Sequence, residues 1–201
     1  MELHFLRHGL TVANVAWILQ GHQPGELTVD QIKAFETIAF DQTGYDDIFC
    51  SPLKRCVDTA QYLDLNSLKL EPLLMERNFG VLEGKNNDEI EAICPEQFLQ
   101  FRQLSEHFKP DKGESRSEHL QRLQKWLQEV SGNGFDKILA ITHGGTIDFI
   151  YRMANGLAMH GGPELFVGEN LGLTKIKMKW PHIELLEFAT PVEEWNKNHA
   201  R

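Results

Sequence analysis

The sequence contains 201 residues, of which 41% are hydrophobic and 24% charged, a composition typical of a globular protein that buries a full core. Its formal net charge of −9 excludes the broad basic surface that non-specific nucleic-acid binding needs, and no apolar stretch is long enough to span a bilayer. Three cysteines lack paired spacing, which predicts free thiols in a reducing compartment. A strand-like run directly follows Met1 where a signal peptide would lie, so we expect a cytoplasmic protein. We expect neither nucleic-acid nor membrane partners.

The first half of the chain alternates strand-like runs with helical patterns, and 10–27 is predicted to be irregular. Strands are expected at residues 2–6, 45–50 and 68–72. A helix is expected from Thr28, because Thr28 and Gln31 have capping-box spacing. A second helix is expected after Ser51, which precedes Pro52 and is interpreted as its cap.

The second half continues the alternation. Residues 88–108 predict helical structure interrupted at Pro95, and the Ser115–Glu118 pair predicts a capping box that opens a longer helix. A further helix is expected over 146–155. Strands are expected at 137–142, 173–178 and 183–188. This order predicts an α/β fold of three layers, α/β/α, with a mainly parallel mixed sheet, in a single domain over 1–201.

Two of the predicted strands end in the same way. Residues 2–6 lead into Arg7-His8-Gly9, and 137–142 lead into His143-Gly144-Gly145. Ligands bind at the carboxyl ends of strands in parallel sheets, and glycine allows a ligand to approach the backbone. Arg55 follows the strand at 45–50 and is expected at the same edge. We therefore expect one site assembled from distant segments.

These residue types favour one kind of chemistry. Neutral imidazole is a nucleophile, and guanidinium groups bind phosphate oxygens through several fixed donors. Phosphoryl transfer needs an in-line nucleophile and positive charge around the transferred group. A carboxylic acid that protonates the leaving oxygen accelerates such a reaction about 100- to 10,000-fold. The other histidines lack the spacing of metal ligands, so no metal is expected.

Five motifs occur in a fixed order along nearly the whole chain: Leu6-Arg7-His8-Gly9 with Thr11 and Asn14, then Gln20-Gly21, Ser51-Pro52-Leu53-Lys54-Arg55-Cys56, Glu76 within 74–80, and Gly113-Glu114-Ser115 with Thr142-His143-Gly144-Gly145. This set resembles the histidine phosphatase superfamily, whose fold is called phosphoglycerate-mutase-like. The resemblance implies that His8 attacks phosphorus and becomes a phosphohistidine. It implies that Arg7, Arg55 and His143 bind the phosphate, and that Glu76 is the general acid and base.

The resemblance also implies that Asn14, Gln20 and Gly144 contact the phosphate or substrate, without a metal or organic cofactor. Glu83 is an alternative acid. Ser51 and Ser115 are interpreted as helix caps only.

The chain thus resembles small phosphatases that release inorganic phosphate from a small phosphorylated metabolite. A broad-specificity phosphatase, an α-ribazole-phosphate phosphatase and a sugar-bisphosphate phosphatase remain open as alternatives. So do a phosphoglycerate-mutase-type phosphotransferase and a noncatalytic phospho-ligand-binding protein. Few basic residues occur in 86–112, a candidate lid, which favours hydrolysis over a mutase reaction. Residues 12–24, 86–112 and 156–172 are expected to determine substrate choice.

Overall fold

A computed structural model describes residues 1–103, 105–160 and 168–192. Within these ranges the chain forms a sheet with the strand order β3-β2-β4-β1-β5-β6. The strands are β1 (Glu2–Arg7), β2 (Asp47–Cys50), β3 (Leu68–Leu70), β4 (Lys137–Thr142), β5 (Gly172–Lys179) and β6 (His182–Pro191). The first four strands in the spatial order are parallel, and β5 and β6 extend the sheet in antiparallel pairing. The predicted mainly parallel mixed sheet is confirmed.

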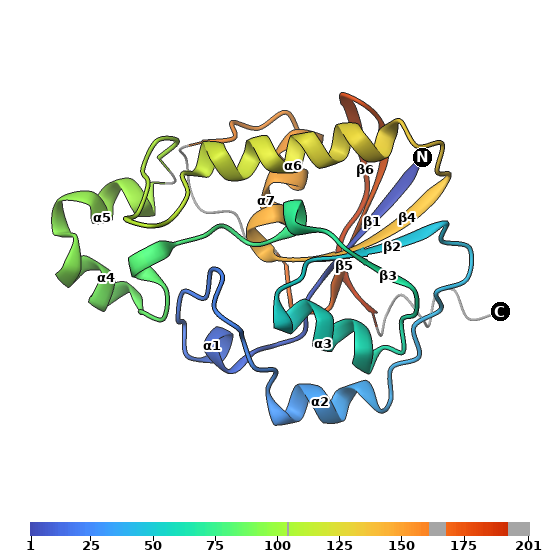
Figure 1. Ribbon diagram of the computed structural model, residues 1–201, viewed down its shortest axis with the longest axis horizontal. Helices are drawn as coiled ribbons and strands as arrows, with labels where there is room; N and C mark the ends of the chain where they lie inside the picture. Colours follow the sequence, from blue (N-terminus) through green and yellow to red (C-terminus); the bar gives the residue numbers. More distant parts are fainter. Residues whose placement is uncertain (104, 161–167, 193–201) are drawn as a thin grey trace.

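Helices cover both faces of the sheet. The α-helices are α1 (Val12–Val15), α2 (Val29–Phe35), α3 (Lys54–Tyr62), α4 (Asn87–Ile93), α5 (Pro95–Arg102), α6 (Arg116–Ser131) and α7 (Gly144–Ala154), with 3₁₀ turns η1 (Pro72–Leu74) and η2 (Gly80–Leu82). Figure 1 shows α2 and α3 on one side of the strands and α6 and α7 on the other. The three-layer α/β/α arrangement is therefore confirmed.

The two faces of the sheet bury separate apolar cores, because successive side chains along a strand point to opposite faces. On β1, Leu6 packs in the core beneath α2 and α3, whereas Leu3 and Phe5 pack in the core beneath α6 and α7. The Phe5 ring meets the buried Trp126 ring of α6 edge-on, at 6.1 Å between centroids. Burial of each such side chain stabilises the folded state by about 1.5–3 kcal/mol, so packing on both faces fixes the position of β1.

Local signals at helix starts are confirmed at two positions. Ser115 and Glu118 form a full capping box at α6. The Thr28 side chain accepts a hydrogen bond from the backbone nitrogen of Gln31 at the start of α2. The Gln31 side chain, however, accepts from the backbone nitrogen of Leu10 and not from Thr28, so it attaches α2 to the loop after β1.

The interpretation of Ser51 as a helix cap is wrong. Helix α3 begins at Lys54, its N-terminal cap position is Leu53, and no side chain caps it. Ser51 is fully buried, and its hydroxyl lies 2.7 Å from Nε2 of His143 and accepts only a long bond of 3.4 Å from the backbone nitrogen of Leu53. Pro52 marks the turn that follows β2. The Ser51 hydroxyl just before it, however, interacts with His143, which lies 92 positions away in the sequence.

Two further differences affect the edge of the sheet where the predicted site lies. Residues 12–15 form the short helix α1 inside a stretch predicted to be irregular, because Thr11 and Asn14 form a capping box. Helix α7 begins at Gly144, two positions before the predicted start, so its first turn directly follows His143.

Helices α4 and α5 stand apart from the sheet, as Figure 1 shows. They are separated at Pro95 as predicted and bury their own cluster, which consists of Leu82, Ile90, Phe101 and Phe108. None of the helices in the described ranges has the length and apolar character needed to cross a bilayer.

Candidate active site

The carboxyl ends of β1 and β4 lie side by side and bring two histidines together. The two strands are parallel neighbours in which Arg7 is paired with Thr142. His8 and His143 are therefore the residues that directly follow each strand. The backbone nitrogen of His8 donates to the Thr142 carbonyl at 3.1 Å. The two imidazole rings are 5.3 Å apart between centroids, at an interplanar angle of 57°. Residues 135 positions apart in sequence therefore form one site.

The hydrogen bonds of His8 leave one ring nitrogen available as a nucleophile. Nδ1 lies 2.8 Å from the Gly9 carbonyl oxygen, which only accepts, so Nδ1 carries the proton and Nε2 keeps its lone pair. His8 is only 3% exposed. Burial, with the positive charges of Arg55 and Arg7, holds the pKa of His8 well below its usual 6.5. The ring is neutral at pH 7.

Arg55 and Ser51 set the tautomer of His143, and Sγ of Cys56 also lies 3.4 Å from its Nε2. Its Nδ1 accepts a hydrogen bond from Nε of Arg55 at 3.2 Å, so the proton lies on Nε2 and is donated to the Ser51 hydroxyl at 2.7 Å. Burial, with the charge of Arg55 and the neighbouring His8, keeps the pKa of His143 well below 6.5. Ser51 therefore orients His143, a role that its interpretation as a helix cap did not include.

Two guanidinium groups, the buried Arg55 and the half-buried Arg7, supply positive charge. Arg55, on the first turn of α3, is 1% exposed and donates to the carbonyl oxygens of Gln23 (2.9 Å) and Gly21 (2.8 Å). Arg7 donates to the Gly168 carbonyl at 2.6 Å. Its Nε is buried and has no hydrogen-bond partner among the described residues, so an anionic oxygen placed there would satisfy it.

Glu76 approaches the same edge from the segment after η1. Its carboxylate accepts hydrogen bonds from the backbone nitrogens of Arg77 (2.8 Å) and Gly145 (3.0 Å). The second of these bonds places the carboxylate at the first turn of α7, which directly follows His143. The structure thus brings together all five residues that the sequence analysis predicted to be catalytic.

Glu83, the alternative acid, has a different environment. Its Oε1 accepts hydrogen bonds from the backbone nitrogens of His22 (2.8 Å) and Phe79 (2.9 Å). These contacts join the first loop to the turn before η2. This arrangement favours Glu76 as the acid.

The remaining predicted residues lie around His8 and His143. The Thr11 hydroxyl is 2.8 Å from Oδ1 of Asn14 and 3.1 Å from Oε1 of Gln20, which places both amides at the loop after β1. Gly144 is the buried first residue of α7, directly after His143.

Besides the role of Ser51, three residues at the site were missed by the sequence analysis. Asn170 donates from Nδ2 to the His8 carbonyl at 2.9 Å and lies 3.3 Å from Oδ1 of Asn14. His22 and Arg122 both donate to the backbone carbonyl of Glu76, at 2.8 and 2.9 Å. Asn170 falls in the 156–172 region expected to affect substrate choice, but no motif distinguished it. His22 and Arg122 carried no signal, because each acts through a backbone atom of a distant segment.

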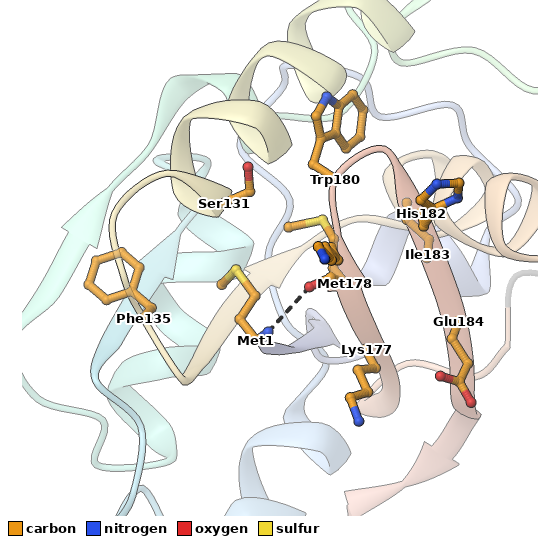
Figure 2. A pocket seen from close by; sticks show the side chains of 10 residues that line it. Met1, Ser131, Phe135, Lys177, Met178, Trp180, His182, Ile183 and Glu184 are labelled. Carbon is orange, nitrogen blue, oxygen red and sulfur yellow. Dashed lines mark hydrogen bonds between the residues drawn. The ribbon is translucent and has the colours of Figure 1, made fainter.

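Other features of the described residues lie outside this site. No group of three or more His, Cys, Asp and Glu side chains there is arranged to hold a metal ion. A pocket of about 600 Å³ lies beside Met1 and the hairpin between β5 and β6 (Figure 2). Because Met1 precedes β1 and His8 follows it, this pocket and the candidate site are at opposite ends of the strand, roughly 20 Å apart.

Comparisons with known proteins point to one family. Residues 3–190 match the model of the histidine phosphatase superfamily (branch 1). The adenosylcobalamin/alpha-ribazole phosphatase of Escherichia coli is 27% identical over 165 residues, covering 78% of this chain and 80% of that protein. Phosphoglycerate mutase-like protein 4 of Arabidopsis thaliana is 30% identical over 162 residues, covering 76% and 70%.

The fold is shared as well. The crystal structure of the alpha-ribazole phosphatase from Shigella flexneri superimposes with a TM-score of 0.79 at 22% identity, over 94% of this chain and 96% of that one. The family match spans almost every motif described above, from β1 to β6. The chain belongs to the histidine phosphatase superfamily, branch 1.

Proposed function

We propose that this protein is a metal-independent phosphomonoester hydrolase that works through a phosphohistidine on His8. The observation that carries the proposal is the state of His8: a neutral ring, protonated on Nδ1, with a free lone pair on Nε2 and the charges of Arg7 and Arg55 nearby. Arg7 and Arg55 supply the positive charge that a transferring phosphoryl group requires.

The proposed first step transfers the phosphoryl group to the enzyme. The lone pair of Nε2 of His8 attacks phosphorus, a P–N bond forms and the ester P–O bond breaks. The leaving oxygen takes the proton of the Glu76 carboxyl group. The Gly9 carbonyl, which accepts from Nδ1–H, stabilises the positive charge that develops on the ring.

The proposed second step restores the enzyme. The Glu76 carboxylate takes a proton from water, the water oxygen attacks phosphorus, and the P–N bond breaks with its electron pair returning to Nε2. Inorganic phosphate leaves, and both His8 and Glu76 are again in their starting states.

The substrate in this proposal is a small phosphorylated metabolite. Relatives whose names include alpha-ribazole phosphatase support a substrate of this size. Residues 86–112, which contain α4 and α5, are proposed to act as a lid. Leu19 of the first loop packs in the α4–α5 cluster, and its backbone bonds to Gly84 and Lys85. A closing lid and the first loop would therefore move together.

A mutase reaction is the second candidate, and the name of the Arabidopsis relative supports it. A mutase has to retain and reorient its phosphorylated intermediate, which calls for further cationic groups over the site. Lys109 of the proposed lid is already paired with Glu118 at 2.7 Å. This pairing favours hydrolysis.

The test is turnover of a panel of phosphate esters by EDTA-treated protein, together with trapping of an acid-labile phosphoenzyme. The His8→Ala variant should lose both signals, whereas the control His107→Ala, at a largely exposed histidine, should retain them. Retention of turnover by His8→Ala, or loss of wild-type turnover with EDTA, would overturn the proposal. Exchange of phosphate between positions of a phosphoglycerate that exceeds hydrolysis would establish the mutase instead.

A further inference from the structure

The segment that carries Glu76 has little regular structure of its own. Residues 76–79 lie outside any helix or strand, between η1 and η2. Their backbone carbonyls therefore need partners from elsewhere in the fold. A general acid also has to be held within about 0.5 Å of its working position. Something other than local secondary structure has to fix this segment.

Arg122 of α6 binds the carbonyl of Glu76 and two carbonyls of the residues that lead into it. Its Nη1 donates to the carbonyl oxygens of Leu73 (2.8 Å) and Met75 (2.6 Å), and its Nη2 donates to that of Glu76 (2.9 Å). One planar guanidinium group thus binds three carbonyls within four residues. No other kind of side chain has this number of donors in a rigid plane.

Glu114 connects Arg122 to the far end of the same segment. Its Oε1 accepts from Nη2 of Arg122 at 2.6 Å and from the backbone nitrogen of Asn78 at 3.0 Å. Its backbone nitrogen donates to the Asn78 carbonyl at 2.8 Å, and its carbonyl accepts from Nε of Arg77 at 2.9 Å. The Arg122–Glu114 pair therefore holds the backbone on both sides of Glu76.

This arrangement determines where the Glu76 carboxylate lies. The carboxylate itself bonds to the backbone nitrogens of Arg77 and Gly145, and Arg122 reaches only the main chain of Glu76. Fixing the main chain on both sides of Glu76 sets the direction of its side chain. We propose that Arg122, held by Glu114, is the positioning residue for the general acid Glu76, an inference that rests on the proposed hydrolase function.

The leaving group distinguishes this role from a merely structural one. A p-nitrophenolate leaves as a weak base and needs little protonation, whereas the alkoxide of benzyl phosphate needs a proton from the acid. In Arg122→Lys, which keeps the charge but not the three carbonyl contacts, kcat/KM for benzyl phosphate should fall about 10- to 100-fold. For p-nitrophenyl phosphate it should change less than about 3-fold.

The controls separate the possible failures. Arg152→Lys alters a buried arginine that binds Asp148 and the Ala158 carbonyl, so it should affect both substrates alike. Glu76→Gln is the reference for the acid itself and should show the full dependence on leaving group. Glu114→Gln, which keeps an acceptor for Asn78, should show a smaller loss of the same kind and serves if Arg122→Lys fails to fold.

The outcomes are distinct. If Glu76→Gln slows both substrates equally, the assigned acid is wrong and the proposed function needs revision. If Glu76→Gln is selective for benzyl phosphate but the folded Arg122→Lys and Glu114→Gln variants are not, the positioning role of Arg122 is overturned and the proposed function stands. Selective losses in all three variants support both.

Discussion

The backbone nitrogen of Gly145 donates a hydrogen bond of 3.0 Å to a carboxylate oxygen of Glu76. A Cβ atom on Gly145 would lie 2.3 Å from the other carboxylate oxygen. Glycine at this position therefore lets the proposed acid approach the first turn of α7, immediately after His143. This contact places the carboxylate at the turn that directly follows His143.

Gly145→Ala should displace the carboxylate without damaging the fold. The flexible end of Glu76 has to move, while alanine suits a helix better than glycine by about 1 kcal/mol. We expect kcat/KM for an alkyl phosphate to fall about 100-fold, near the low end of what a general acid contributes. The melting temperature should stay constant or rise.

Gly132→Ala is the matched control for this substitution. Gly132 caps the end of α6, and the nearest atom to its added Cβ would be the Glu129 carbonyl at 3.6 Å. It should leave both activity and stability close to wild type. Full activity in Gly145→Ala would contradict the placement of the acid.

The two serines first interpreted as caps should behave differently. Ser51→Ala removes the acceptor of the His143 Nε2 proton, which leaves a buried donor unpaired at a cost of about 1–3 kcal/mol. It also frees His143 to change tautomer, so kcat/KM should fall at least about 10-fold. Ser115→Ala removes only a helix cap, so unfolding free energy should fall by about 1 kcal/mol with activity unchanged. Steady-state kinetics and urea unfolding of both variants check this contrast, and equal activities would contradict it.

Glu83→Ala should act on stability and not on the chemical step. Removing its carboxylate leaves the backbone nitrogens of His22 and Phe79 without their acceptor, each at a cost of about 1–3 kcal/mol where buried. Activity toward alkyl and aryl phosphates should decline by the same factor. A loss confined to alkyl phosphates would instead identify Glu83 as the acid.

Stability should decrease as the pH falls below about 6.5. Burial is the main cause that lowers the pKa of His8, His119 and His143 well below 6.5 in the folded state. The unfolded chain binds protons at these residues as the pH falls through 6.5, whereas the folded chain does not. The stabilisation is therefore complete above that pH and is lost below it, by up to about 1.4 kcal/mol per pH unit for each histidine.

Urea unfolding between pH 5 and 8 measures this dependence. His119→Gln, at a buried position bonded to Thr146, should reduce the slope by about one proton, whereas His107→Gln at an exposed position should not. A flat profile down to pH 5.5 would contradict the prediction.

Much of the fold could be predicted because its signals are local. The Ser115–Glu118 capping box, the interruption at Pro95 and the apolar runs of β1 and β4 each depend on residues within a few positions of one another. Parallel strands place their carboxyl ends at one edge, so the meeting of His8 and His143 also followed from pattern. The chemical roles of the predicted site residues stay predictions.

The sequence pattern could not predict contacts between a side chain and a partner that lies far away along the chain. Ser51 has the sequence context of a cap, but its hydroxyl is 2.7 Å from His143, and only the packing of β2 against β4 decides that. Arg122 lies on the polar side of a helix in sequence, yet it binds three carbonyls of the Glu76 segment. The sequence by itself determined the strands, the helices and the reactive groups at their ends. The tertiary structure alone decided how those groups are oriented, because tautomer and carboxylate position depend on hydrogen bonds whose partners are far apart along the chain.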